Sequence, residues 1–109
     1  MTIENLRKEH ELIELFCNLA EIPSPSLHEE NVAKWIQAYC GQNNMNCRFD
    51  DYGNVRIDIP ATDSTKEPLL LSAHMDVIGD DAPVKTYLDD SGNIHAEGRT
   101  LGADDKAGI

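Results

Sequence analysis

The spacing of apolar residues changes midway along this 109-residue chain, and that change constrains its fold more than any other feature. Over residues 3–20 apolar side chains recur at the spacing of one helical face, which predicts a helix. A second helix is expected over 27–40, followed by Gly41 at its C′ position. Beyond residue 44 apolar and polar residues alternate, as they do in strands. The buried faces of the two helices are expected to include Leu12, Ile13, Phe16, Leu19 and Ala20 in the first, and Val32, Ile36, Tyr39 and Cys40 in the second.

A proline-containing loop over residues 22–26 separates the two predicted helices. Pro23 and Pro25 interrupt helical structure there. Ser26 precedes Glu29 by three residues, which fits a capping box in which the serine side chain accepts an N3 amide hydrogen bond.

The second half of the chain predicts strands and turns. A hairpin is expected over 45–59 and a polar surface loop over 60–68. The continuous apolar run Leu69–Leu71 suits a short strand buried on both faces, as in the middle of an α/β sheet. Residues 87–96 predict two further short strands around a turn that contains Gly92. The chain is therefore assigned to the α/β class, as one domain over residues 1–109.

Composition excludes several partners. The formal net charge is −11, from 9 basic and 20 acidic residues, which argues against binding to nucleic acid or to an anionic membrane surface. No apolar run approaches the roughly 20 residues of a membrane span, and the N-terminus does not resemble a signal peptide. A cytoplasmic location is the default expectation. The three cysteines form no Cys-x-x-Cys pair, so reduced thiols are expected.

A first segment with candidate metal-binding residues lies at the end of the apolar run. His74 and Asp76 lie two residues apart, so in a strand both would point to the same face. A carboxylate that accepts a hydrogen bond from one imidazole nitrogen orients the other nitrogen toward a metal. Ligands of open α/β sheets gather at the carboxyl ends of strands. The alternative is a histidine that only hydrogen-bonds at a strand end, and His-x-Asp alone is weak evidence for a metal.

A second segment, Gly98–Gly108, places adjacent aspartates in a glycine-containing turn. Asp104 and Asp105 could attract a hard cation, or they could cap a helix that starts there. One carboxylate that bridges two metals roughly 3.5–4 Å apart is a known arrangement for amide hydrolysis. Because a native chain rarely stops in the first turn of a helix, the sequence is expected to be part of a longer protein.

Together the two segments resemble a known family. The run 71–77 (Leu-Ser-Ala-His-Met-Asp-Val) is similar to the first metal motif of the di-zinc exopeptidases related to peptidase T, carboxypeptidase G and aminoacylase. The run 98–108 resembles their second motif, in the form typical of the peptidase T branch. The loop 22–26 and its flanking helices are also similar to the family's N-terminal region.

The resemblance implies roles for three residues. His74 would ligate one zinc, Asp104 would bridge two zinc ions, and Asp76 would be the active-site residue that orients His74. It also implies a cis peptide bond between Asp104 and Asp105. Asp105 and Lys106 match the motif, but helix capping and ion pairing suffice to explain them.

The resemblance further implies a fold and an activity. The chain would be the N-terminal part of a three-layer αβα catalytic domain with a mixed sheet, from a cytoplasmic tripeptide aminopeptidase-like enzyme. That enzyme would hydrolyse short peptides through a water activated by two Zn²⁺ ions, with Co²⁺ or Mn²⁺ as alternative metals. It would form a homodimer through a domain absent from this chain. The general base and remaining ligands would lie beyond residue 109, so the segment alone is expected to be inactive.

Two alternatives to a peptidase remain open at this stage. One is a related amidohydrolase or deacylase of the same family. The other is a catalytically inactive fragment that acts only by binding a partner.

Overall fold

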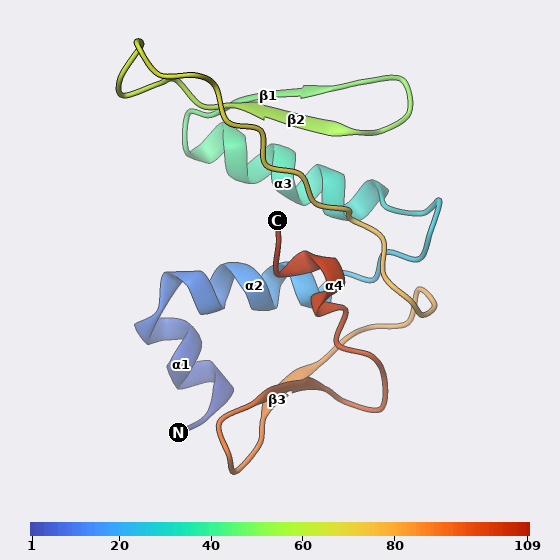
Figure 1. Ribbon diagram of the computed structural model, residues 1–109. Helices are drawn as coiled ribbons and strands as arrows, with labels where there is room; N and C mark the ends of the chain where they lie inside the picture. The colour runs from blue at the N-terminus through green and yellow to red at the C-terminus, as the bar shows by residue number, and fades with distance from the viewer.

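The structure is a computed structural model that describes all 109 residues, and its helices and strands form two groups (Figure 1). One group comprises α3 (Glu30–Gln42) and the hairpin of β1 (Asn46–Phe49) and β2 (Val55–Asp58). The other comprises α1 (Ile3–Glu9), α2 (Glu11–Glu21), the hairpin of β3 (Thr86–Leu88) and β4 (Ile94–Ala96), and α4 (Ala103–Lys106). None of the four helices has both the length and the apolar character needed to cross a membrane.

The helix predicted over residues 3–20 is divided in two. His10 adopts an extended conformation between α1 and α2. The break lets Arg7 turn back along α2, where its guanidinium bonds to Glu14, Asn18 and Glu21 at 2.5, 2.8 and 2.5 Å. In one straight helix Arg7 and Glu21 would lie about 21 Å apart along the axis, beyond the reach of an arginine side chain. Leu12, predicted on the buried face, is exposed.

Helix α3 begins and ends later than predicted. Leu27 has a positive φ of 71°, a left-handed conformation that a helix cannot include. The expected capping box is wrong, because Glu29 accepts a hydrogen bond from the Leu27 N–H and the Ser26 hydroxyl bonds to Asp76. Gly41 lies within α3, and Asn44 adopts the left-handed conformation expected near the C-terminus of the helix.

Both predicted hairpins are confirmed. Strands β1 and β2 pair antiparallel with Cys47 opposite Ile57, and β3 and β4 pair with Tyr87 opposite His95. Each turn is closed by an aspartate at its start, Asp50 or Asp89, whose carboxylate accepts backbone N–H groups of the turn.

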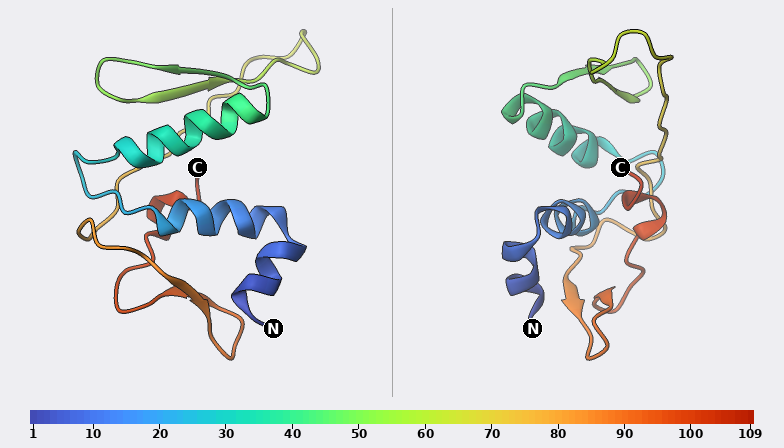
Figure 2. Two further views of the ribbon diagram at one scale, coloured as in Figure 1. Left: turned by 180° about the vertical axis from the view of Figure 1, so that it is seen from behind. Right: turned by 60° about the vertical axis from the view of Figure 1, so that its left-hand side comes forward.

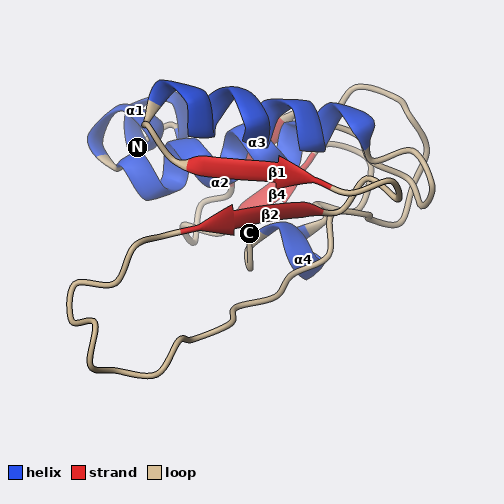
Figure 3. Ribbon diagram, turned by 90° about the horizontal axis from the view of Figure 1, so that it is seen from above, coloured by secondary structure: helices blue, strands red, loops and turns tan.

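The strand predicted at Leu69–Leu71 is wrong for this chain. These leucines belong to no strand and are 83, 88 and 82% exposed. They lie in the long connection between β2 and β3, drawn without regular structure in Figure 3. A strand buried on both faces needs neighbouring strands, but the four strands here pair only within their own hairpins. The mixed sheet therefore does not form within these 109 residues, although both helices and strands are present as the α/β class predicts.

The main apolar core joins α2, α3 and the first hairpin. Its centre consists of Leu19, Val32, Ile36 and Cys40, and the half-buried residues around it are Ile22, Trp35, Cys47, Val55 and Met75. Figure 2 shows α2 and α3 running beside each other, with the connection between β2 and β3 passing across α3. Met75 thus anchors the first motif to the core. All three cysteines are free thiols, as predicted.

Candidate metal site

His74 lies between two carboxylates that come from the two motifs. Its Nε2 is 3.0 Å from Asp104 Oδ1, across thirty residues of sequence. Its Nδ1 lies 3.0 Å from Asp76 Oδ1 and 2.9 Å from the Asp76 backbone oxygen. The structure thus brings together the three residues that the sequence singled out. These contacts raise the pKa of His74, chiefly through the hydrogen bond to Asp104.

The carboxylate of Asp76 is held on both sides. Oδ1 faces the imidazole, and Oδ2 accepts a hydrogen bond of 2.6 Å from the Ser26 hydroxyl. The Ser26 hydrogen bond is the main reason that the pKa of Asp76 lies below its usual value. Sequence analysis missed this role of Ser26, because a capping box explained the same residue locally and nothing in the sequence shows a contact across fifty positions.

The loop that carries Ser26 is fixed to the first motif by a fully buried serine. Ser24 donates its hydroxyl to the Met75 carbonyl at 2.7 Å, and its own carbonyl accepts the Val77 N–H at 2.8 Å. Because these bonds flank Asp76, they fix the position of the loop relative to the Asp76 carboxylate.

The second motif contacts the first motif at a glycine, Gly102. Gly102 has a φ of 78°, and a Cβ there would lie 3.0 Å from Val77 Cγ1. The close contact of Gly102 with Val77 carries Asp104 to His74 at the start of α4. The peptide bond between Asp104 and Asp105 is cis, as the family resemblance implied.

Lys106 anchors the second motif to the loop. Its side chain is buried, and Nζ donates to the Ile22 carbonyl, so it makes a backbone contact rather than the ion pair that the sequence suggested. Burial, with a smaller effect of Arg99, lowers the pKa of Lys106 to about 8.

The donors at His74 and Asp104 fit a zinc ion. An imidazole nitrogen and a carboxylate oxygen are both zinc ligands, and two such ligands on one tetrahedral ion stand about 3.3 Å apart. The observed 3.0 Å separation of Nε2 and Oδ1 is close to that value. The Asp104 side chain is 96% exposed, which leaves its second oxygen accessible to another cation. No group of three or more metal-binding side chains is assembled by this chain.

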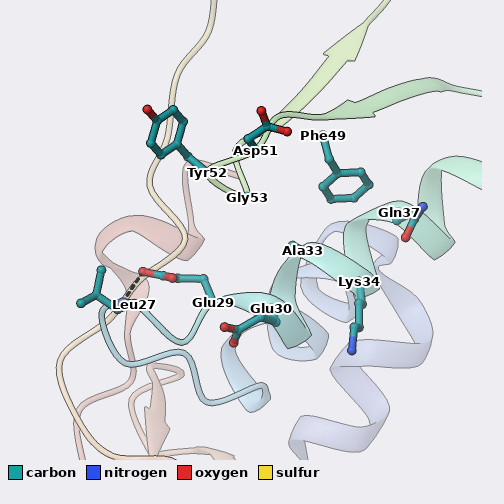
Figure 4. Close-up of a pocket in the computed structure, with 10 residues that line it drawn as sticks. All are labelled: Leu27, Glu29, Glu30, Ala33, Lys34, Gln37, Phe49, Asp51, Tyr52 and Gly53. Atoms are coloured by element: carbon teal, nitrogen blue, oxygen red, sulfur yellow. Dashed lines mark hydrogen bonds between the residues drawn. The ribbon is translucent and has the colours of Figure 1, made fainter.

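A hollow of about 500 Å³ lies elsewhere, between α3 and the tip of the first hairpin (Figure 4). Leu27, Glu29 and Lys34 line one side of it, and Phe49 and Tyr52 line the other. It contains none of the three residues around His74. The hollow is therefore separate from the candidate metal site.

Comparison with known proteins identifies peptidases. No protein-family model matches the chain. The chain is 32% identical over 110 residues to the cytosol non-specific dipeptidase of Escherichia coli (strain K12), over 90% of its own length and 22% of that protein. It is 29% identical to the protein YqjE of Bacillus subtilis (strain 168), over 93% of its length and 29% of that relative. Among solved structures, it matches the aminoacylhistidine dipeptidase of Vibrio alginolyticus with a TM-score of 0.76 and 34% identity, over 89% of this chain and 22% of that one.

These likenesses assign a class first: the chain is homologous to part of a peptidase that hydrolyses small peptides. The dipeptidase names of two of these proteins agree with the exopeptidase resemblance that the two motifs carry. The chain spans less than a third of the length of each relative. The narrower assignment to the peptidase T branch is not confirmed, and the placement of residues 1–109 at the N-terminus of the catalytic domain stays a prediction.

The contact between His74 and Asp104 predicts a shifted titration. Asp104→Asn removes the negative charge that favours the imidazolium, so the pKa of His74 should fall toward its ordinary value of 6.5. Titration of the imidazole carbon-bound protons by NMR in the metal-free protein measures this shift. Asp81→Asn, a change in an exposed loop, is the control. An unchanged His74 pKa in Asp104→Asn would contradict the contact.

Burial of Lys106 predicts a rise of stability with pH. Between pH 8 and 10.5 the folded chain has released the Lys106 proton while the unfolded chain, with an ordinary pKa of 10.5, still holds it. Because the unfolded state then binds more protons, this group makes the free energy of unfolding increase over that interval. Urea denaturation across pH 7.5–10.5 measures the free energy of unfolding of wild type and of Lys106→Met. The value for wild type should increase with pH relative to the value for Lys106→Met. A constant difference would show that the lysine is not buried as described.

Proposed function

We propose that the whole protein is a metal-dependent peptidase acting on short peptides, and that His74 and Asp104 hold its metal ions. One observation carries the proposal: the His74 imidazole has Nδ1 against Asp76 and Nε2 directed at Asp104. The dipeptidase names of two relatives support the peptidase activity.

Each of the three side chains would have a different role in the site. His74 would be the neutral nitrogen ligand of one zinc, and Asp104 would bridge that zinc to a second. When bound, a zinc pair polarises a peptide carbonyl and lowers the pKa of water that attacks it. With metal bound, Asp76 would hold the single His74 proton on Nδ1 and leave the Nε2 lone pair for the ion, and its charge would increase the basicity of that ligand. Co²⁺ or Mn²⁺ could replace zinc, because imidazole and carboxylate donors also bind them.

The substrate class that we propose is short peptides, with dipeptides the first to test. The sequence pointed to a tripeptide aminopeptidase of the peptidase T branch, whereas the names of two relatives favour dipeptides. A cytoplasmic location is supported by the name of the first relative. In the whole protein we expect the three-layer αβα domain with a mixed sheet, in which Leu69–Leu71 gains strand neighbours. A homodimer also remains a proposal.

The test is peptide hydrolysis by the full-length protein before and after metal removal. Activity on unmodified dipeptides and tripeptides should be lost on exhaustive chelation and restored by Zn²⁺. His74→Ala should lower kcat/KM by at least about 100-fold, since loss of an orienting partner alone costs 10–100-fold. His28→Ala, outside the site, should retain activity.

Hydrolysis that persists in protein shown to be free of metal would overturn the proposal. Hydrolysis of N-acyl amino acids with no cleavage of peptides would keep the metal site and replace the substrate class.

A further inference from the structure

The Ser26 hydroxyl is the only group outside the two motifs that hydrogen-bonds to the side chain of His74, Asp76 or Asp104. It reaches Asp76 Oδ2 at 2.6 Å, an ordinary distance for a hydroxyl that donates to a carboxylate. An ionised carboxylate only accepts, so the hydroxyl must donate. The hydroxyl proton of Ser26 therefore lies in the hydrogen bond to Asp76.

We propose that Ser26 is a positioning residue for the metal ligand His74, acting through Asp76. The inference rests on the function proposed above. With Oδ1 bound to the imidazole and Oδ2 bound to Ser26, the carboxylate cannot rotate about its Cβ–Cγ bond without breaking one contact. The plane of the carboxylate then fixes the plane of the imidazole, and with it the direction of Nε2.

The loop is built to hold the Ser26 hydroxyl at that place. Two residues earlier, the buried Ser24 binds the backbone on both sides of Asp76. One residue later, Leu27 takes a left-handed φ of 71° although its side chain is exposed. Such a conformation is costly for a bulky residue and persists only where surrounding contacts determine it. The Leu27 N–H bonded to Glu29 is one such contact. The turn therefore presents Ser26 to Asp76 from a fixed backbone.

Zinc affinity of the full-length protein, measured by competition with a chromophoric chelator, tests this role. Ser26→Ala should weaken zinc binding about 10-fold, the lower end of the effect of losing an indirect partner. Ser26→Thr keeps the hydroxyl and should restore the affinity to within about 2-fold. Ser64→Ala, an exposed serine in the 60–68 loop, is the matched control and should have no effect.

A double-mutant cycle separates positioning from a general structural effect. If Ser26 acts through Asp76, the loss caused by Ser26→Ala should disappear in an Asp76→Ala background. Equal losses in both backgrounds, or unchanged affinity in Ser26→Ala while wild type binds zinc, would overturn the inference and leave the proposed function intact. Absence of zinc binding by the wild-type protein would overturn both.

Discussion

Three residues of the loop between α2 and α3 bind the two segments that carry the chemistry. Ser24 and Ser26 hydrogen-bond to the chain around Asp76, and the Ile22 carbonyl accepts the buried Lys106 ammonium from the second motif. The separation of the motifs is thirty residues in sequence, yet both meet one short loop. The approach of His74 to Asp104 depends on this shared anchorage, because neither motif belongs to a sheet in this chain.

The apolar core explains why the loop itself is fixed. Ile22 packs against the cluster of α2 and α3, and Met75 packs against the same cluster from the first motif. Burial of these side chains stabilises the loop and the motif together, since each removes apolar surface from water. The hydrogen bonds of Ser24 then set the register between them. A packed core thus determines the placement of an exposed site.

Local patterns predicted much of this structure. Turn residues and alternation identified both hairpins, and the family resemblance identified His74, Asp76 and Asp104 as neighbours. Features that depend on distant contacts were missed. The first predicted helix breaks at His10, where Arg7 turns back to bind along α2, and Ser26 bonds to Asp76 instead of capping α3. Leu69–Leu71 failed as a strand for the same reason, because a strand also requires partners, and apolar character alone does not supply them.

The proposed metal site requires that His74 and Asp104 share a metal ion. Anomalous diffraction from crystals of the zinc-loaded full-length protein tests it most directly. We expect a zinc peak about 2.0–2.2 Å from both His74 Nε2 and an Asp104 oxygen, with Nδ1 still bonded to Asp76. Zinc bound elsewhere, with His74 and Asp104 joined only by their hydrogen bond, would contradict it.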